Sequence, residues 1–228
     1  MLLGPGQMAF QATPIPQPGP DEIVLKIGAA LTCGTDVKAF RRGHPKWPPP
    51  IRFGHEYAGT VAARGSQVTT VREGDAVMLA PTGPCGQCFY CTREQENLCV
   101  SLMETMVIGG YAEYVSIPAR VHQTNLFPKP DKLSFAEASL LEPLSCVVFG
   151  LAPIVLRPDD TAVIIGAGAF GLLHLIVLRL LGVERVYVVA RNPYRAQIAR
   201  ELGATGIIAR SAKDAREEVL ALTDGRGA

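Results

Sequence analysis

The sequence lacks a surplus of charge of either sign. Lys and Arg total 22 and Asp and Glu total 21, which leaves a formal net charge of +1 at neutral pH. Proteins that bind nucleic acid or an anionic membrane surface usually carry a marked excess of basic residues. The charge balance therefore argues against both kinds of partner.

Long hydrophobic runs are also missing. The most apolar stretch, residues 170–181, contains His174 and Arg179, and it falls short of the roughly 18 uninterrupted apolar residues that cross a membrane. The first ten residues lack the basic start and the long apolar core of a secretion signal. With 48% apolar and 19% charged residues, we expect a globular, cytoplasmic protein without membrane association.

Residues 1–150 differ in texture from the rest of the chain. They are rich in glycine and proline, and turn residues bound their short extended runs at 22–29, 57–63 and 76–79. This pattern predicts an irregular, β-rich domain with few helices.

Residues 151–228 instead alternate between short β-branched runs and helix-length segments. The expected strands are 161–165, 185–190 and 206–209, and the expected helices are 169–181, 193–202 and 212–222. This alternation predicts an α/β domain with a parallel, doubly wound sheet. Because a complete fold of this kind has about six strands, we expect a truncated domain.

Four of the six cysteines lie close together in the first part of the chain. They are Cys85, Cys88, Cys91 and Cys99. In a cytosolic protein such a cluster indicates a metal and not disulfides. Four thiolates satisfy the tetrahedral preference of zinc, and a closed site of four protein ligands is structural. The spacing therefore predicts a structural zinc ion in a lobe at residues 83–100.

Three other interpretations of the cysteine cluster are less favoured. The related iron–sulfur pattern closes with a three-residue gap and a proline, whereas here the last gap is longer and Val100 follows. A zinc ribbon for nucleic acid would need two separated cysteine pairs and a basic surface. Four unligated thiols are the third alternative.

A second group of candidate ligands is dispersed along the chain. Cys33 begins C-G-T-D after a predicted strand, His55 and Glu56 belong to G-H-E, and Glu142 begins E-P-L. Each residue alone is a weak signal, because single cysteines and histidines commonly pack in the core. Together they supply a thiolate, an imidazole and carboxylates, which suit a zinc site with three protein ligands and one open position.

These motifs, the cysteine lobe and G-G-Y-A-E-Y at 109–114 occur in one characteristic order. In this order the chain resembles the zinc-dependent medium-chain alcohol dehydrogenases, most closely the sorbitol and threonine dehydrogenase branch. The resemblance covers essentially the whole chain. It implies a GroES-like catalytic domain over 1–150 and a partial dinucleotide-binding Rossmann domain over 151–228. It also implies two zinc ions per chain, and a homodimer or homotetramer for the full-length protein.

The resemblance assigns roles to the dispersed group. Cys33 and His55 match the family's catalytic zinc ligands, and Glu142 matches the carboxylate that replaces a second cysteine in this branch. Glu56 matches a carboxylate that ligates the metal or lies directly behind it, so the two glutamates are alternative ligands.

The resemblance also covers the residues around the metal. Thr35 matches the hydroxyl that passes on the substrate proton, and Asp36 matches the acid that orients the zinc histidine. Many relatives carry a histidine three residues after this threonine, but this chain has Lys38. The far end of the proton path therefore departs from the family pattern.

The other three histidines and the sixth cysteine have simpler interpretations. His44 lies in a proline-rich loop, and a place at the rim of the substrate cleft is the less favoured alternative for it. His122 and His174 are expected to be structural. Cys146 lies one helical turn after Glu142, and core packing is favoured over metal ligation.

Gly166, Gly168 and Gly171 form a G-x-G-x-x-G motif that includes Phe170. Such a motif is weak alone, but here it follows a predicted strand and opens a predicted helix. The first glycine permits a tight turn, the second lets backbone approach a pyrophosphate, and the third lets helix and strand pack closely. The motif predicts a nicotinamide-dinucleotide site.

The second predicted strand of this domain ends without the acidic residue that usually binds the adenosine ribose. Ala190 and Arg191 stand there, and Arg195 follows one turn later. A guanidinium binds phosphate well, so we predict that Arg191 and Arg195 favour NADP over NAD. The alternative is a solvated Arg191 and use of NAD.

The leading hypothesis is a zinc-dependent enzyme that transfers hydride between a secondary alcohol and NAD(P). The resemblance implies a polyol, a sugar or an amino alcohol as the small-molecule substrate. A zinc-free enone or quinone reductase on the same scaffold is less favoured, because the candidate zinc ligands are retained. A truncated zinc-binding protein without activity is the non-enzymatic alternative.

Overall fold

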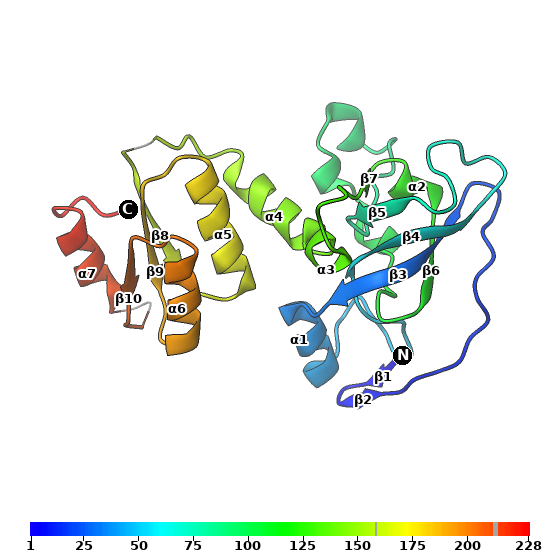
Figure 1. The fold of residues 1–228 in the computed structure, drawn as a ribbon, viewed down its shortest axis with the longest axis horizontal. Helices are drawn as coiled ribbons and strands as arrows, with labels where there is room; N and C mark the ends of the chain where they lie inside the picture. Colours follow the sequence, from blue (N-terminus) through cyan, green and yellow to red (C-terminus); the bar gives the residue numbers. More distant parts are fainter. Residues whose placement is uncertain (158, 212–213) are drawn as a thin grey trace. The chain divides into compact units, whose positions relative to one another are not determined.

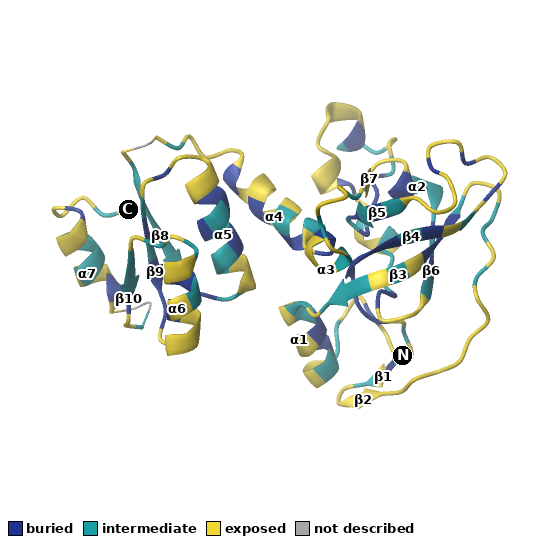
Figure 2. Ribbon diagram, viewed as in Figure 1, coloured by how far each residue is buried: buried dark blue, intermediate teal, exposed yellow. Residues whose placement is uncertain are grey.

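An antiparallel sheet organises the first part of the molecule. Its five strands lie in the order β6-β3-β4-β5-β7. The strands are β3 (Ile23–Leu31), β4 (Glu56–Arg64), β5 (Ala76–Leu79), β6 (Tyr114–Ile117) and β7 (Leu126–Pro128). The long strands β3 and β4 form the centre of the sheet, and β4 is buried along most of its length (Figure 2).

The register of the sheet places one face of β3 in the core. Leu25 pairs with Val61 of β4 on one side and with Val115 of β6 on the other. All three are fully buried members of one hydrophobic cluster. Because side chains alternate across a strand, the apolar residues at every second position account for this core.

The structure describes residues 1–157, 159–211 and 214–228. Two compact units divide the chain, Met1–Glu142 and Pro143–Ala228. The first unit contains short elements besides its sheet (Figure 1). They are β1 (Leu2–Gly4), β2 (Gln7–Met8), α1 (Gly34–Arg42), η1 (Cys91–Arg93), η2 (Glu96–Leu98), η3 (Met103–Thr105), α2 (Ala119–His122) and α3 (Phe135–Ala138).

Helix α3 packs directly on the central strands. A side chain at Gly28 would meet the ring of Phe135 at 2.5 Å, so glycine is needed in β3 for this close approach. The Ser134 side chain accepts a hydrogen bond from the backbone N–H of Glu137, whose carboxylate accepts from the Ser134 N–H. Such a capping box defines where a helix begins.

The second unit is built on a parallel sheet in the order β10-β9-β8. Its elements are β8 (Thr161–Ile165), α5 (Ala169–Leu180), β9 (Arg185–Val189), α6 (Pro193–Glu201), β10 (Gly206–Ile208) and α7 (Ala215–Leu222). Helix α4 (Leu141–Leu151) begins just before the division. Leu175 of α5 and Val186 and Val188 of β9 are fully buried in the hydrophobic core of the second unit.

The predicted fold class is confirmed, with an irregular β-rich unit followed by a parallel α/β unit. Strands β5 and β8 have the predicted bounds, and the other predicted elements differ by one or two residues at their ends. The predicted helix 212–222 starts at residues outside the described part, and α7 is described from Ala215.

The predicted core packing of Cys146 is wrong, because its side chain is exposed. Helix α4 buries Pro143, Val147 and Leu151, which recur every four residues and define one face. Cys146 is adjacent in sequence to that face but does not belong to it. Within the described residues, no helix is both long and apolar enough to cross a bilayer.

Candidate metal centres and dinucleotide site

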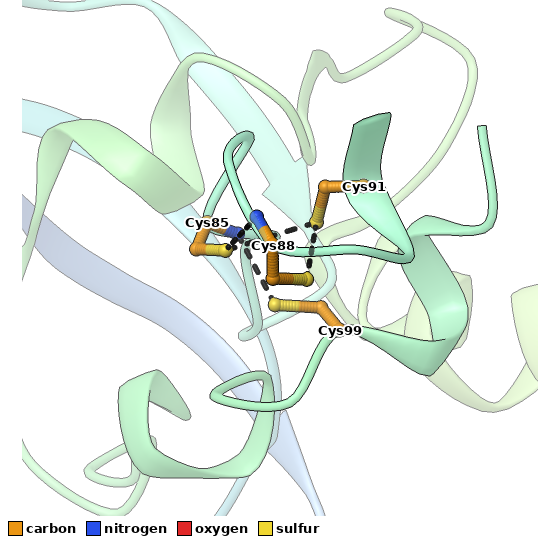
Figure 3. Close-up of side chains that lie close together, drawn as sticks. All are labelled: Cys85, Cys88, Cys91 and Cys99. Carbon is orange, nitrogen blue, oxygen red and sulfur yellow. Dashed lines mark hydrogen bonds between the residues drawn. The ribbon is translucent and has the colours of Figure 1, made fainter. Parts of the chain in front are cut away.

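The four lobe cysteines come together as their spacing predicts. The four side chains point toward one another (Figure 3), and their sulfurs lie within 4.8 Å of one another. The Cys88 and Cys91 sulfurs are 3.5 Å apart, and those of Cys85 and Cys91 are 3.9 Å apart. Tetrahedral zinc with bonds of about 2.3 Å would place its sulfurs about 3.8 Å apart. The donor set therefore fits a zinc ion.

Hydrogen bonds within the lobe prepare some thiols to ionise. Burial opposes ionisation of Cys99, but the backbone N–H groups of Cys85 and Ser101 outweigh it and lower the pKa of Cys99 to about 6. Backbone N–H groups also lower the pKa of Cys88 to about 7. Burial, followed by the hydrogen bond with Cys88, raises the pKa of Cys91 to about 11. Thiolates are the metal-binding form of cysteine, so two of the ligands are readily available near neutral pH.

Arg120 of α2 anchors the lobe to the rest of the first unit. Its Nε donates to the Pro84 carbonyl at 2.9 Å, and its Nη2 lies 2.9 Å from the Ser101 hydroxyl and 3.7 Å from the Cys99 sulfur. A guanidinium beside a thiolate stabilises the negative charge that a set of four thiolates would concentrate here.

The register of β3 and β4 creates the second cluster. Leu31, the last residue of β3, pairs with Glu56, the first residue of β4. Cys33 follows two residues after β3, and His55 directly precedes β4, so the two strand ends bring them together. The ligand atoms of Cys33, His55 and Glu56 lie within 4.8 Å of one another, and both His55 and Glu56 are buried.

Asp36 fixes the orientation of His55 and the start of helix α1. One carboxylate oxygen lies 3.1 Å from His55 Nδ1, and the other accepts from the backbone N–H of Cys33 at 2.9 Å. The Cys33 sulfur caps the same helix by accepting from the Thr35 N–H at 3.5 Å. With Nδ1 on Asp36, Nε2 is the nitrogen left for a metal, as in the carboxylate–histidine–metal arrangement.

The Asp36 carboxylate also changes the proton affinity of His55. Burial lowers its pKa, but hydrogen bonds with Asp36 and Cys33 outweigh burial and raise the pKa of His55 to about 10. The Trp47 ring packs against His55 with centroids 5.6 Å apart. An imidazole with this raised pKa holds its proton at neutral pH, so a metal would have to displace a proton from His55 in order to bind.

Glu142 and Thr35 lie at the margin of this cluster. Burial raises the pKa of Glu142, which also experiences the charges of His55, Glu56 and Asp36. The side chain of Glu142 is half-buried, and the close three-residue ligand group does not include it. Thr35 is half-buried in the first turn of α1, directly after the Cys33 cap.

The glycine motif forms a tight connection between β8 and α5. Gly166 has a positive φ of 105°, and a side chain at Gly171 would meet the Gly166 carbonyl oxygen at 1.9 Å. A side chain at Gly168 would meet nothing within 4 Å, so its surroundings are open. Phe170 is 43% exposed. These are the properties that a pyrophosphate-binding turn requires.

A cavity of about 610 Å³ lies at the carboxyl ends of β8 and β9. Its lining includes Gly166, Ala190, Arg191 and Arg195. The Asn192 side chain caps α6 by accepting from the Arg195 N–H at 3.1 Å, which fixes the start of the helix that carries Arg195. The two predicted arginines are thus brought to one site.

Sequence analysis missed a third arginine in this cavity. Arg210 follows β10 and joins the lining, and its Nε forms an ion pair with Glu218 of α7 at 3.1 Å. Because Arg210 is distant in sequence from the glycine motif, only the parallel pairing of β10 with β9 reveals its place. The described lining contains arginine side chains but neither Asp nor Glu.

The remaining histidines lie outside the two cysteine-containing clusters. His122 is buried, and its Nε2–H donates to the Asp21 carbonyl at 2.8 Å. His174 Nδ1–H donates to the Phe170 carbonyl one turn earlier at 2.7 Å. His44 stacks on Trp47 with ring centroids 4.2 Å apart. These contacts are those of structural side chains, and a position for His44 at a substrate cleft stays a prediction.

Known proteins match both units. Residues 19–131 match the alcohol dehydrogenase GroES-like domain, and residues 169–228 match the zinc-binding dehydrogenase domain. The chain is 33% identical to sorbitol dehydrogenase of Bacillus subtilis and 34% identical to L-threonine 3-dehydrogenase of Bacillus velezensis. These alignments cover 97% and 96% of the chain, but 63% and 65% of the relatives.

Solved structures of dehydrogenases also match the chain across both units. A protein of Sinorhizobium meliloti described as a zinc-binding dehydrogenase, with NADP bound, matches with a TM-score of 0.84 and 32% identity, covering 95% of this chain and 62% of that one. An alcohol dehydrogenase of Escherichia coli with NADH matches with a TM-score of 0.86 and 28% identity, covering 98% and 65%.

The fold, an antiparallel GroES-like unit followed by a parallel α/β unit, is that of the zinc-binding dehydrogenases, and the clustered cysteine, histidine and carboxylate side chains lie in the first unit. The chain belongs to the zinc-dependent medium-chain alcohol dehydrogenase family, in its sorbitol and threonine dehydrogenase-like branch. It spans about two thirds of the length of the relatives that it matches.

Proposed function

We propose that this protein is a zinc-dependent dehydrogenase that oxidises a secondary alcohol of a polyol, sugar or amino alcohol to a ketone and prefers NADP. The observation that carries the proposal is the joining of Cys33, His55 and Glu56 within 4.8 Å at the ends of β3 and β4. A thiolate, an imidazole and a carboxylate fit a zinc site with an open position. The resemblance to sorbitol and threonine dehydrogenases supports the substrate class.

Cys33 and His55 would hold the catalytic zinc, with Glu142 as the third ligand and Glu56 as the alternative. The four lobe cysteines would hold a second, structural zinc. When bound, the catalytic zinc supplies a Lewis acid that lowers the pKa of an alcohol hydroxyl. The proximity of Glu56 to Cys33 and His55 favours Glu56 in the metal-free arrangement.

The side chains around this site would handle the substrate proton. Asp36 holds His55 by its Nδ1, so that Nε2 keeps its lone pair for the metal. The Thr35 hydroxyl, in the first turn of α1, would accept the substrate proton and pass it outward. Lys38 lies three residues on, on the same face of the helix, and is exposed to the solvent that would receive the proton.

The arginines at the second cavity would select the cofactor. Arg191, Arg195 and Arg210 border a site that lacks the usual ribose-binding carboxylate. Guanidinium groups bind a phosphate monoester through charge-assisted hydrogen bonds, which favours the 2′-phosphate of NADP. Related structures contain NADP in one case and NADH in another, so both cofactors occur among relatives, and the arginines support NADP for this chain.

Steady-state kinetics on a panel of polyols, sugars and amino alcohols, with both cofactors, test the proposal. We expect kcat/KM for NADP to exceed that for NAD by about tenfold or more, as one or two charge-assisted hydrogen bonds would give. Arg191→Ala should lower kcat/KM for NADP and leave NAD nearly unchanged. A clear preference of the unaltered protein for NAD would refute the cofactor assignment, and activity unaffected by zinc removal would refute the metal assignment.

Two alternatives carry less support. A zinc-free reductase is disfavoured because the chain keeps both sets of candidate ligands. One set consists of four cysteines, and the other of a cysteine, a histidine and a glutamate. A zinc-binding protein without activity is the other alternative, and the kinetic panel separates it from the proposal. Assembly as a homodimer or homotetramer and a cytoplasmic location stay predictions.

A further inference from the structure

The hydroxyl of Tyr111 comes from a distant part of the chain and lies beside the Cys33, His55 and Glu56 group. Its oxygen lies 3.0 Å from the Leu31 carbonyl, 3.0 Å from the Thr32 hydroxyl and 3.1 Å from Asp36 Oδ2. One phenol therefore joins the end of β3 to the carboxylate that orients His55. Neither the proton relay nor the ligand set described above uses it.

Backbone contacts hold Tyr111 beside the segment that carries His55 and leads into β4. The N–H groups of Gly109 and Gly110 donate to the Gly54 carbonyl at 2.9 and 3.0 Å, and the Tyr111 N–H donates to the Phe53 carbonyl at 2.9 Å. A side chain at Gly54 would meet the Tyr111 ring at 2.7 Å. The tyrosine loop is thus attached to the two residues that directly precede His55.

A phenol has one proton, so its three neighbours cannot all accept from it. Carbonyl and carboxylate oxygens only accept, whereas the Thr32 hydroxyl can donate to the phenol oxygen. A hydrogen bond to an anion is stronger than one to a neutral carbonyl. The favoured arrangement therefore runs from the Thr32 hydroxyl to Tyr111, and from the Tyr111 hydroxyl to the Asp36 carboxylate.

With this bond, each side of the Asp36 carboxylate has a fixed donor. Oδ2 accepts from the Cys33 N–H and from Tyr111, while Oδ1 faces His55 Nδ1 at 3.1 Å. A carboxylate held by three donors on different segments cannot rotate without losing one of them. Asp36 is 1% exposed, so water does not readily replace a lost donor.

We infer that Tyr111 is a positioning residue for the catalytic metal site: its hydroxyl holds the Asp36 carboxylate in the orientation that keeps His55 Nε2 directed to the metal. The inference rests on the proposed function, because it takes the Cys33 cluster to be the metal site. It extends that proposal by adding Tyr111, from a separate segment of the chain, to the residues on which the geometry of the metal ligands depends.

Cobalt binding to Tyr111→Phe tests this inference without an activity assay. Co²⁺ is added to metal-free protein, and the catalytic site is isolated as the difference spectrum against Cys33→Ser. We expect Tyr111→Phe to weaken Co²⁺ at this site about threefold to tenfold and to shift its visible bands, because outer partners of a metal-ligating histidine commonly affect affinity about tenfold or more. The lobe site should be unchanged in the same titration.

Tyr57→Phe is the matched control. Tyr57 is a buried tyrosine whose hydroxyl donates to the Val107 carbonyl at 3.1 Å, so this variant loses the same atom from the same unit without touching Asp36. Thr32→Val removes the donor to Tyr111 and should produce a smaller loss, about twofold. If Tyr111→Phe does not fold, the Co²⁺ affinity of Thr32→Val tests the positioning role in its place.

Each result has one meaning. Loss of affinity and a spectral shift in Tyr111→Phe, absent in Tyr57→Phe, support the positioning role. Unchanged binding in Tyr111→Phe, an equal loss in Tyr57→Phe, or an unfolded Tyr111→Phe with unchanged Thr32→Val overturns it. If the unaltered protein binds no Co²⁺ that depends on Cys33, the proposed metal site itself fails, and the inference fails with it.

Discussion

A single carboxylate couples the folding of a helix to the geometry of the candidate metal ligands. Asp36 closes the capping box of α1 with Cys33, and its second oxygen holds His55. The helix cannot begin at a different residue without moving both the Cys33 sulfur and the imidazole. The side chains that would bind zinc are therefore placed by local backbone structure even when no metal is bound.

Asp36→Asn should separate these two roles. The amide keeps an acceptor for the Cys33 N–H but removes the charge beside His55. We expect zinc affinity at the Cys33 cluster to fall about 10-fold to 100-fold, with lobe affinity unchanged, in competition with a chromophoric chelator. Asp75→Asn is the control, since the Asp75 carboxylate caps an exposed turn by accepting from the Arg72 N–H at 2.7 Å. Equal losses in both variants would refute the specific role of Asp36.

The Asp36–His55 pair predicts that the stability of the metal-free protein depends on pH. The pKa of His55 rises from its ordinary 6.5 to about 10 on folding, so the Asp36–His55 pair stabilises the folded state fully below pH about 6.5. That stabilisation is lost as pH rises through about 10. The difference in free energy of unfolding between the unaltered protein and Asp36→Asn should therefore shrink from pH 6 to pH 10.5.

Urea denaturation followed by fluorescence measures this difference. The only tryptophan of the chain, Trp47, packs on His55 and is buried, so its emission follows the relevant unit. Asp75→Asn should show a difference that stays constant with pH. A difference for Asp36→Asn that is flat, or larger at high pH, would contradict the account.

At the scale of elements, Arg120 connects helix α2 to the cysteine lobe. Arg120→Gln should weaken zinc at the lobe about tenfold, because it removes a cation 3.7 Å from the Cys99 sulfur and the bond to the Pro84 carbonyl. Arg93→Gln is the control, since Arg93 belongs to the lobe but stacks over Phe89 at 3.8 Å. Chelator competition measures both variants, and similar affinities would show that Arg120 has no electrostatic role.

The turn between β8 and α5 predicts different outcomes for two of its glycines. Gly171→Ala should lower the free energy of unfolding by roughly 1–3 kcal/mol, because the new methyl would meet the Gly166 carbonyl at 1.9 Å. Gly168→Ala should leave stability nearly unchanged, because the new methyl meets nothing within 4 Å. It should instead weaken dinucleotide binding, since this glycine allows backbone to approach the pyrophosphate.

Urea denaturation and titration with NADPH check the two glycine variants. The expected result is a crossed pattern, with lost stability in Gly171→Ala and lost affinity in Gly168→Ala. If Gly168→Ala binds NADPH as tightly as the unaltered protein, the turn is not the pyrophosphate site.

Elements with a regular apolar pattern could be predicted from sequence, and features that depend on pairing could not. Strand β8 has the predicted bounds because its β-branched residues form one short run. The short strands β1 and β2 carry no periodic pattern, and they were not predicted. Arg210 and Tyr111 reach their sites through the pairing of β10 with β9 and through the loop bound to Gly54, neither of which leaves a local sequence signal.

At the scale of the whole molecule, the candidate metal ligands and the candidate cofactor-binding residues belong to different units. Both candidate metal clusters lie within Met1–Glu142, and the glycine motif and the three arginines lie within Pro143–Ala228. Two distinct donor sets in one unit, one of four thiolates and one of mixed type, are the central claim about this protein. Their independence can be measured directly.

The most direct test is the zinc content per chain of protein purified without chelator, for the unaltered chain, Cys33→Ser and Cys99→Ser. The account predicts close to two zinc ions in the unaltered chain and close to one in each variant. It also predicts that alcohol oxidation is lost in Cys33→Ser. One zinc in the unaltered chain, unchanged by Cys33→Ser, would contradict a metal site at the ends of β3 and β4 and would leave only the lobe filled.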